Sequence, residues 1–351
     1  MKYIAENTVI DYKENYIRRN TEKIFETPFS DFDVCADDKG NEFIICQDKE
    51  NGIYLITISG ADVSSRCLLQ SRITEGYEKF FNAEYVNGWI NALYSIKHED
   101  KILLIHHIIN SDIKPFVLDS LEEQTRVFMF KDYEDNLYAF YKNGQVGYKK
   151  YDWKSKVWSQ FTAVCEAEGQ LLFASGDFTK EPQFAFSVKK EKEVLVYCMD
   201  KVLISGIREE VKPIVINYRR ELTVLFEYQG RILKSVNVSG DSFTRPKYAY
   251  FGSVSRYELI TSISDTYKTK TYASLTPRGT YRSLLMNEKP VKEIIKEPDP
   301  MPEETSVEKK YDEIIKLLEN KSEYEILAGI MNKLTLIEKM LEDIKNGNTS
   351  E

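Results

Sequence analysis

Residues 42–58, EFIICQDKENGIYLITI, consist of two apolar runs separated by a short polar turn. Runs of this length that are rich in Ile, Leu, Phe and Tyr suit a pleated surface, and the short polar turn between them is typical of a β-hairpin. The pattern returns five more times, at intervals of roughly 40 to 50 residues. The other copies are INALYSIKHEDKILLIHHI (90–108), NLYAFYKNGQVGYKKYD (136–152), QFAFSVKKEKEVLVYCMD (183–200), LTVLFEYQGRILKSVNV (222–238) and LITSISDTYKTKTYASL (259–275).

Each hairpin is flanked by two further apolar runs, which gives about four short strands per unit. In the first unit the flanking runs are FDVCADD (32–38) and SRCLLQS (65–71). The second unit is weakest in its first strand, FNAEYVNG (81–88), and the fifth is weakest in its last, where Pro246 intervenes. Proline tolerates only an edge strand, and the last strand of such a unit is an edge. We therefore expect an all-β head over residues 31–287.

Six units of four strands resemble the six-bladed β-propellers as a superfamily, over about three quarters of the chain. No Trp-Asp dipeptide stands in the WD40 position and no sialidase-type Asp-box is present, so no single family is indicated. The resemblance implies a propeller fold, with six blades expected and seven as the alternative, and it implies no particular function. A β-sandwich, or a pair of sandwiches, is the competing interpretation of the same short strands.

Residues 1–30 precede the first complete unit, and their role stays open at this stage. Their apolar residues, among them Ile4, Val9, Ile10 and Ile17, are consistent with a strand that pairs with the last unit and closes the ring. An arm docked outside the head, or a seventh, degenerate blade, would use the same residues.

The composition changes abruptly after Met286. Four of the ten prolines lie between residues 290 and 302, interspersed with Glu and Asp, which favours an extended spacer over residues 288–305. Thr305 with Glu308 forms a capping box, and so does Ser322 with Glu325, so we expect helices within 306–346. The sequence thus predicts a β head, a Pro/Glu-rich linker and a C-terminal helical segment.

The second predicted helix carries apolar residues at alternating spacings of three and four. This is a coiled-coil seam with Leu at position a and Ile at position d, a pattern that leans toward trimers or tetramers. The alternative is a helical hairpin within one chain, or docking on a helical partner protein. The predicted oligomerisation residues are Leu327, Ile330, Leu334, Ile337, Leu341 and Ile344.

Charge and hydropathy exclude several classes of protein. The chain has a net charge of −8. Residues 288–351 hold 16 acidic and 10 basic residues, which leaves 40 acidic and 38 basic for residues 1–287. This lacks the basic footprint of nucleic-acid binding. No run of eighteen apolar residues predicts a membrane span, and the first twenty residues lack a secretion signal, so we expect cytoplasmic synthesis. Five cysteines without a C-x-x-C indicate core thiols in a reducing compartment.

No catalytic motif is present, and we predict no catalytic residue, metal or cofactor. His106 and His107 are neighbours on an expected strand, so they point to opposite faces and cannot share a metal. Asp37, Asp132 and Asp177 end the first runs of their units, where carboxylates could ring one mouth of a propeller channel; the alternative is ordinary turn chemistry. Trp153, in the loop YDWKSK, is the tryptophan expected to be exposed and available to stack on a sugar.

The layout of head, spacer and coil leads to a functional hypothesis. We expect a non-enzymatic structural or recognition protein whose propeller head is displayed on a self-associating tail. A phage, a phage-like particle or a spore assembly would be a suitable setting. The alternative is a glycan-binding lectin or a glycoside hydrolase of propeller fold, with the acidic residues at the channel acting on the sugar.

Overall fold

The structure is a computed structural model, and its described residues all belong to the β head. They are 2–5, 8–73, 76–177, 179, 181–218, 221–239, 242–249, 259–263, 270–275 and 281–284. The chain divides into two compact units, Met1–Lys289 and Pro290–Glu351. The predicted spacer, both predicted helices and the seam lie outside the described residues.

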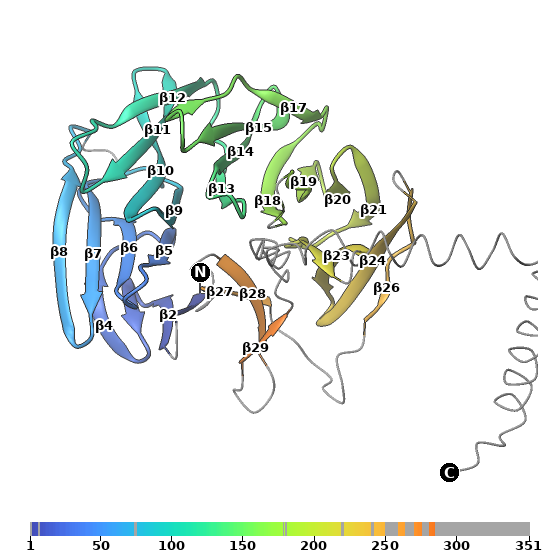
Figure 1. The fold of residues 1–351 in the computed structure, drawn as a ribbon, viewed down its shortest axis with the longest axis horizontal. Coiled ribbons are helices and arrows are strands. Elements are labelled where there is room, and N and C mark those ends of the chain that lie inside the picture. Colours follow the sequence, from blue (N-terminus) through green and yellow to red (C-terminus); the bar gives the residue numbers. More distant parts are fainter. Residues whose placement is uncertain are drawn as a thin grey trace, which may run out of the picture. The chain divides into compact units, whose positions relative to one another are not determined.

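The described chain is all-β and forms repeated antiparallel sheets, which fit a β-propeller. The sheets follow one another around a common centre, and in four of them the first strand can be seen on the side nearest to that centre (Figure 1). Three of them are β5 (Phe32–Ala36), β6 (Glu42–Gln47), β7 (Ile53–Ser59) and β8 (Asp62–Leu69); β9 (Phe81–Val86), β10 (Trp89–His98), β11 (Lys101–Ile109) and β12 (Phe116–Leu121); and β18 (Gln170–Gly176), β19 (Phe184–Lys190), β20 (Glu193–Cys198) and β21 (Lys201–Ile207).

Two further sheets have an outer strand that is split into two short pieces. In the second of these, Pro246 lies between the pieces, at the position where the sequence predicted a weak edge strand. These sheets are β13 (Phe128–Lys131), β14 (Leu137–Asn143), β15 (Gln145–Asp152), β16 (Val157–Trp158) and β17 (Thr162–Cys165); and β22 (Ile214–Tyr218), β23 (Glu221–Tyr228), β24 (Arg231–Ser239), β25 (Ser242–Phe243) and β26 (Lys247–Tyr248).

The N-terminal segment forms four strands of its own rather than a single arm. They make an antiparallel meander whose first strand also pairs in parallel with a strand near the other end of the head, with Ile4 opposite Ser262. Main-chain hydrogen bonds thus join the two ends of the head. The strands of this combined sheet are β29 (Tyr281–Leu284), β28 (Lys270–Leu275), β27 (Leu259–Ile263), β1 (Lys2–Ala5), β2 (Thr8–Lys13), β3 (Tyr16–Arg19) and β4 (Glu22–Glu26).

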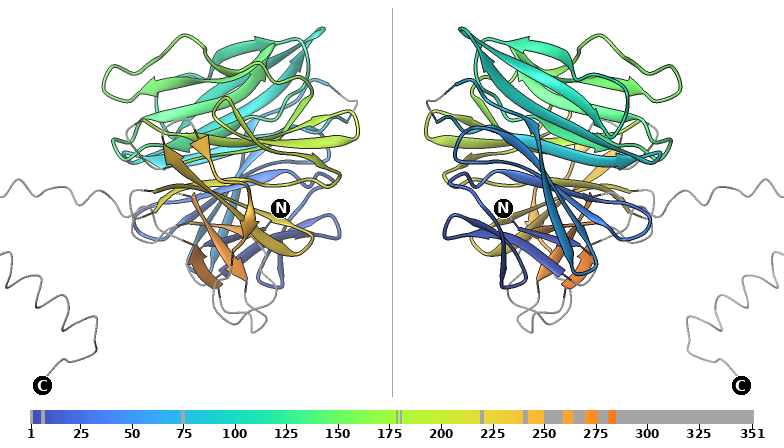
Figure 2. Two further views of the ribbon diagram at one scale, coloured as in Figure 1. Left: turned by 90° about the vertical axis from the view of Figure 1, so that its right-hand side faces the viewer. Right: turned by 90° about the vertical axis from the view of Figure 1, so that its left-hand side faces the viewer.

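The core lies in layers between consecutive sheets, which face one another in both side views (Figure 2). Ile10 and Ile17 of the N-terminal meander pack against Phe32 and Val34 of β5, and similar clusters fill the next interfaces. An inner strand is therefore covered on both faces. This explains why every residue of β5 and β6 is buried, instead of only every second one.

Turn residues set the register of the hairpins. Asn87 and Gly88, between β9 and β10, both have positive φ, at 49° and 86°. This is the type I′ turn, whose twist matches that of the flanking strands and which Asn-Gly strongly favours. FNAEYVNG, the weakest first strand by sequence, consequently forms a full inner strand.

Polar side chains on the inner strands bond to the backbone of the next sheet. The carboxylates of Asp31 and Asp33 accept the N–H groups of Phe81 and Ala83 in β9, at 2.8 and 2.7 Å. One edge of β9 is occupied by β10, so these N–H groups on its other edge need another acceptor. The two bonds therefore satisfy buried donors and fix the spacing of two sheets at once.

The same arrangement recurs at other interfaces. Asn82 of β9 accepts the N–H of Met129 at 3.1 Å and donates to the carbonyl of Val127 beside β13. Ser175 of β18 accepts the N–H of Val215 in β22 at 2.9 Å. The bonded residues are separated by 50, 47 and 40 positions in the chain, which is one repeat. We call these contacts the inter-sheet bonds.

We predict that Asn82→Ala destabilises the head by about 1–3 kcal/mol, because two backbone groups lose their partner. Urea unfolding followed by circular dichroism measures the effect. Asn143→Ala is the matched control, since that amide makes only a long, exposed 3.5 Å contact with Asp119; its effect should stay within about 0.5 kcal/mol. Equal effects of the two changes would contradict a structural role for the inter-sheet bonds.

Candidate functional site

The turn after β5 is organised by Asp37. Its Oδ1 accepts the N–H groups of Lys39 and Asn41, both at 2.9 Å, and its Oδ2 accepts the Asn41 side-chain amide at 2.7 Å. This carboxylate therefore serves as the acceptor that closes a tight Asx-type turn. Sequence reasoning left open whether Asp37 shapes a turn or acts on a ligand, and its hydrogen bonds are those of a turn.

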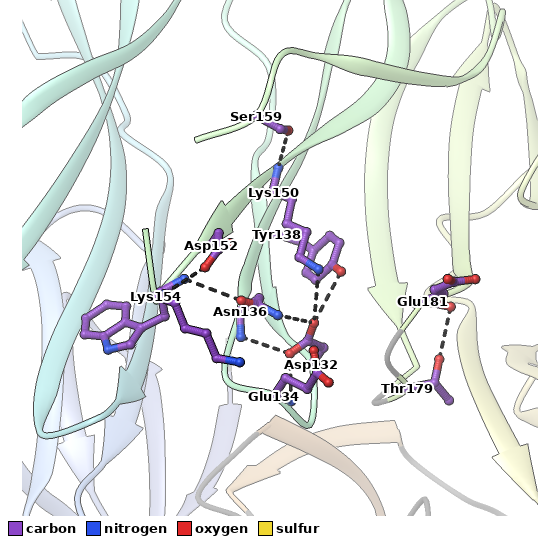
Figure 3. A network of polar contacts seen from close by, with 11 residues as sticks. Asp132, Glu134, Asn136, Tyr138, Lys150, Asp152, Lys154, Ser159, Thr179 and Glu181 are labelled. Atoms are coloured by element: carbon purple, nitrogen blue, oxygen red, sulfur yellow. Dashed lines mark hydrogen bonds and ion pairs between the residues drawn. The ribbon is translucent and has the colours of Figure 1, made fainter. Parts of the chain in front are cut away.

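Asp132 repeats this geometry in the sheet two repeats later (Figure 3). Its Oδ1 accepts the N–H groups of Glu134 and Asn136, both at 2.9 Å. Its Oδ2 accepts the Asn136 amide at 3.0 Å and the Tyr138 hydroxyl at 3.3 Å, and it lies 3.8 Å from the Lys150 ammonium. Burial, together with the Asp132 charge, raises the pKa of Tyr138 above its ordinary value. The carboxylate is fully buried and surrounded by donors.

Asp177 differs from the other two because half of its carboxylate has no partner. Its Oδ1 accepts the Thr179 hydroxyl and the Gln183 N–H, each at 2.9 Å. Among the described residues no group donates to its buried Oδ2. Burial raises the pKa of Asp177 to about 6. This carboxyl is thus the least satisfied of the three, although it is enclosed by the protein.

Each of the three aspartates bonds to groups of its own turn, and these bonds bring no two of them together. All three are buried, which turn chemistry alone does not imply. The inner-strand packing that encloses them is a tertiary effect. Ligand binding by Asp37, Asp132 or Asp177 stays a prediction.

Sequence reasoning missed a group of charged residues before the inner strands. Asp31 precedes β5, and burial raises its pKa to about 7, partly offset by the Phe81 N–H and the nearby Arg126 charge. Lys79 precedes β9 and is buried, with its ammonium 3.9 Å from the centre of the Tyr77 ring and without a hydrogen-bond partner in the described part of the chain. Burial lowers the pKa of Lys79 to about 8. An acid followed by alternating apolar residues, Asp31-Phe32-Asp33-Val34, is the signal that could have revealed the first of these.

The exposed tryptophan is not the one that the sequence indicated. Trp153, expected to be the exposed one, is half-buried against Tyr151, with ring centroids 5.6 Å apart. Trp89, the first residue of β10, is 36% exposed. Its position in the YDWKSK loop does not reveal that Trp153 packs against the apolar cluster between the β9–β12 and β13–β17 sheets. If a sugar stacks on this head, Trp89 is the more accessible platform.

His106 lies in an aromatic contact between two sheets. Its Nε2 is 3.1 Å from Asn91 Oδ1, and its Nδ1 accepts the indole N–H of Trp158 at 3.2 Å. Burial lowers the pKa of His106 to about 3, so the ring is neutral near pH 7. His107 points instead to Tyr94, as neighbouring residues of a strand do. The pair cannot share a metal.

Among the described residues, no group of three or more His, Cys, Asp or Glu side chains is placed to hold a metal ion. No helix in the described part of the chain is long and apolar enough to cross a membrane. The five cysteines form no disulfide: Cys35, Cys46 and Cys198 are buried, as expected for core thiols, whereas Cys67 is exposed.

Comparison with known proteins leaves the chain without a family. No family model and no curated protein matches it. Similar solved structures include the SapL1 lectin bound to α-methyl fucoside, at 6% identity and TM-score 0.44, covering 72% of this chain and 96% of the lectin. A mutant of AofleA from Arthrobotrys oligospora has 11% identity and TM-score 0.43, covering 72% and 81%. The aldose sugar dehydrogenase of Streptomyces coelicolor, in its PQQ-bound form, has 8% identity and TM-score 0.43, covering 74% and 94%. With TM-scores below 0.5, these likenesses carry no functional inference.

We predict that Asp31→Asn changes how stability depends on pH. A carboxyl whose folded pKa is raised from 3.8 to about 7 contributes stability that is complete below pH 3.8 and is lost as the pH rises to 7. Asparagine keeps an acceptor for the Phe81 N–H but does not titrate. Between pH 5 and 8 the variant should therefore gain about 2–3 kcal/mol relative to the native chain.

Unfolding free energies at several pH values measure this difference. Asp38→Asn is the matched control, because Asp38 is exposed and lies close by in the chain. Parallel pH profiles for the native chain and Asp31→Asn would contradict the raised pKa.

Proposed function

We propose that this chain is a non-enzymatic structural or recognition protein, with a β-propeller head displayed on a self-associating coiled-coil tail. In this proposal the ring holds the six sequence repeats, and the four-stranded N-terminal meander forms a seventh blade. The head supplies a rigid binding surface, and self-association of the tail brings several copies of this surface together. Multivalent display raises avidity without any new contact.

The observation that carries this proposal is how the inner carboxylates are used. Asp37 and Asp132 are saturated by the N–H and amide groups of their own turns. Asp31 and Asp33 accept backbone groups of the adjacent sheet. A glycosidase needs two carboxyl groups facing a sugar subsite, one to donate a proton and one to act as base or nucleophile. Carboxylates committed to turns and inter-sheet bonds are poorly placed for either task.

The tail supports the display part of the proposal through its sequence pattern. An apolar stripe that repeats every 3.5 residues needs a partner helix, since it cannot stay exposed in water. The proline-spaced acidic segment before it favours an extended spacer that keeps heads apart. A trimer or tetramer of this kind would suit a component of a phage, a phage-like particle or a spore assembly.

Glycan binding is the second candidate function, and the exposed ring of Trp89 favours it. An exposed aromatic ring beside a tight turn offers a flat platform for the apolar face of a sugar. A glycan array probed with the native chain and with Trp89→Ala tests this candidate, with Trp153→Ala as the control for a half-buried ring. Binding that is lost only in Trp89→Ala would support a lectin.

The non-enzymatic proposal is tested by an assay for reducing sugars released from a panel of polysaccharides. We expect no release above that of a heat-treated sample. Hydrolysis that disappears in Asp37→Asn, Asp132→Asn or Asp177→Asn, while the melting temperature of that variant is unchanged, would overturn the proposal. Asp38→Asn is the control, because its exposed carboxylate lies next to Asp37 in the chain.

We predict that the tail controls assembly. Each buried Leu or Ile contributes roughly 1.5–3 kcal/mol, so Leu334→Asp with Ile337→Asp should dissolve a three-heptad bundle. Mass in solution, by light scattering or sedimentation, measures the change from trimer or tetramer to a smaller species. Glu342→Lys with Asp343→Lys, at positions b and c of the heptad, is a control away from the seam. If the native chain has the same mass as the seam variant, the tail does not self-associate.

A further inference from the structure

The outermost strands differ in how their free edges are protected from pairing with another chain. β4 is five residues long, and three of these are charged. The pairing of β12 is broken by a bulge, β21 pairs irregularly, and the outer strands of the two remaining sheets are split. Short, charged, bulged or interrupted edges are the common devices that prevent edge-to-edge association.

β8 lacks these devices over most of its length. It has eight residues, DVSSRCLL, without proline or lysine, and its pairing with β7 is regular from Asp62 to Cys67. Seven of its eight side chains are exposed, including Val63 at 49% and Leu69 at 39%. β8 is the last strand of its sheet and lies at the rim of the head (Figure 1). Its outer edge therefore presents backbone groups that no described strand pairs.

We propose that β8 is a docking edge for β8 of a second copy of this chain, in an antiparallel ladder centred on Ser64. Such a ladder continues the β5–β8 sheet of one molecule into that of the other through main-chain hydrogen bonds. The pairing is isologous, so both copies use the same surface and the assembly closes as a dimer.

The charges on β8 favour this register. In a two-fold antiparallel pair centred on Ser64, Asp62 of each copy lies directly opposite Arg66 of the other. Directly opposite residues point to the same face with Cβ atoms about 4.5–5.5 Å apart, which suits an ion pair. Asp62 forms no ion pair among the described residues, and Arg66 donates to Asn110 Oδ1 at 2.8 Å while keeping further N–H groups available.

The neighbouring registers are less favourable. Side chains alternate between the two faces of a strand. In a two-fold ladder, even-numbered residues therefore lie opposite even-numbered ones and odd opposite odd, and another register is reached by moving the centre along the strand. Centring on Ser65 places Asp62 opposite Leu68, and centring on Arg66 places two guanidinium groups opposite each other. Of these three registers, the one centred on Ser64 is the one that places two pairs of opposite charges directly across from each other. The residues that form these pairs also lie within Asp62 to Cys67, where β8 pairs regularly with β7.

Charge reversal tests the proposal in the full chain carrying Leu334→Asp and Ile337→Asp, so that the tail does not contribute. We expect a dimer, measured by sedimentation at about 10 to 300 μM because an interface this small belongs to the weak class. Asp62→Arg alone and Arg66→Asp alone each place like charges directly across from each other. Each should therefore raise the dissociation constant of the dimer about tenfold or more. The double change D62R/R66D restores opposite charges and should restore the dimer. Glu22→Arg on β4 is the control and should have no effect.

Three results would overturn the proposal: a monomer throughout this concentration range, a dimer that neither single reversal weakens, or a double change that fails to recover it. None of them bears on the proposed function of head and tail, which the seam variant and the sugar-release assay test separately.

Oxidative cross-linking reads the register directly. Ser64→Cys should give a covalent dimer, because position 64 lies opposite itself. Ser65→Cys should not, and neither should the native Cys67, whose two copies would be about 20 Å apart along the ladder at about 3.3 Å per residue. Cross-linking through Ser65→Cys instead of Ser64→Cys would overturn the assigned register.

Discussion

The inter-sheet bonds are the constraint on which the rest of the head depends. Stacked sheets can slide over one another when only apolar side chains join them, because the hydrophobic effect is not directional. The carboxylates of Asp31 and Asp33 fix one sheet to the backbone of the next at 2.8 and 2.7 Å. Asn82 and Ser175 do the same at later interfaces. The bonded residues are about one repeat apart in the chain, so each of these bonds joins two consecutive sheets.

This constraint also explains where the acids lie and what they are free to do. Inner-strand acids are buried with backbone N–H groups as partners, and turn acids such as Asp132 are surrounded by amide, hydroxyl and ammonium groups. These carboxyl groups serve as hydrogen-bond acceptors that hold the architecture. The surfaces that remain available to partners are on the outside, among them the exposed Trp89 and the unprotected edge of β8.

The hairpins could be predicted from the sequence because their signals are local. The runs in 42–58 and 183–200 correspond to β6–β7 and β19–β20 within a few residues. The strands in residues 2–26 were harder, since runs such as YIRR and EKIFE carry little apolar periodicity and depend on packing against β5. The site was predicted least well. Trp153 packs against the apolar cluster between two sheets, and the burial of Asp31 and Lys79 depends on neighbouring sheets, so none of these three environments follows from local sequence.

Hydrogen exchange at single amides tests the central claim most directly. The N–H groups of Phe81, Ala83, Met129 and Val215 are each accepted by a side chain of the preceding sheet. If these bonds hold the head together, the four amides should exchange only through global unfolding and respond to denaturant as the most protected core amides do. Fast exchange at these amides, while the paired amides of β6 and β7 stay protected, would contradict the account.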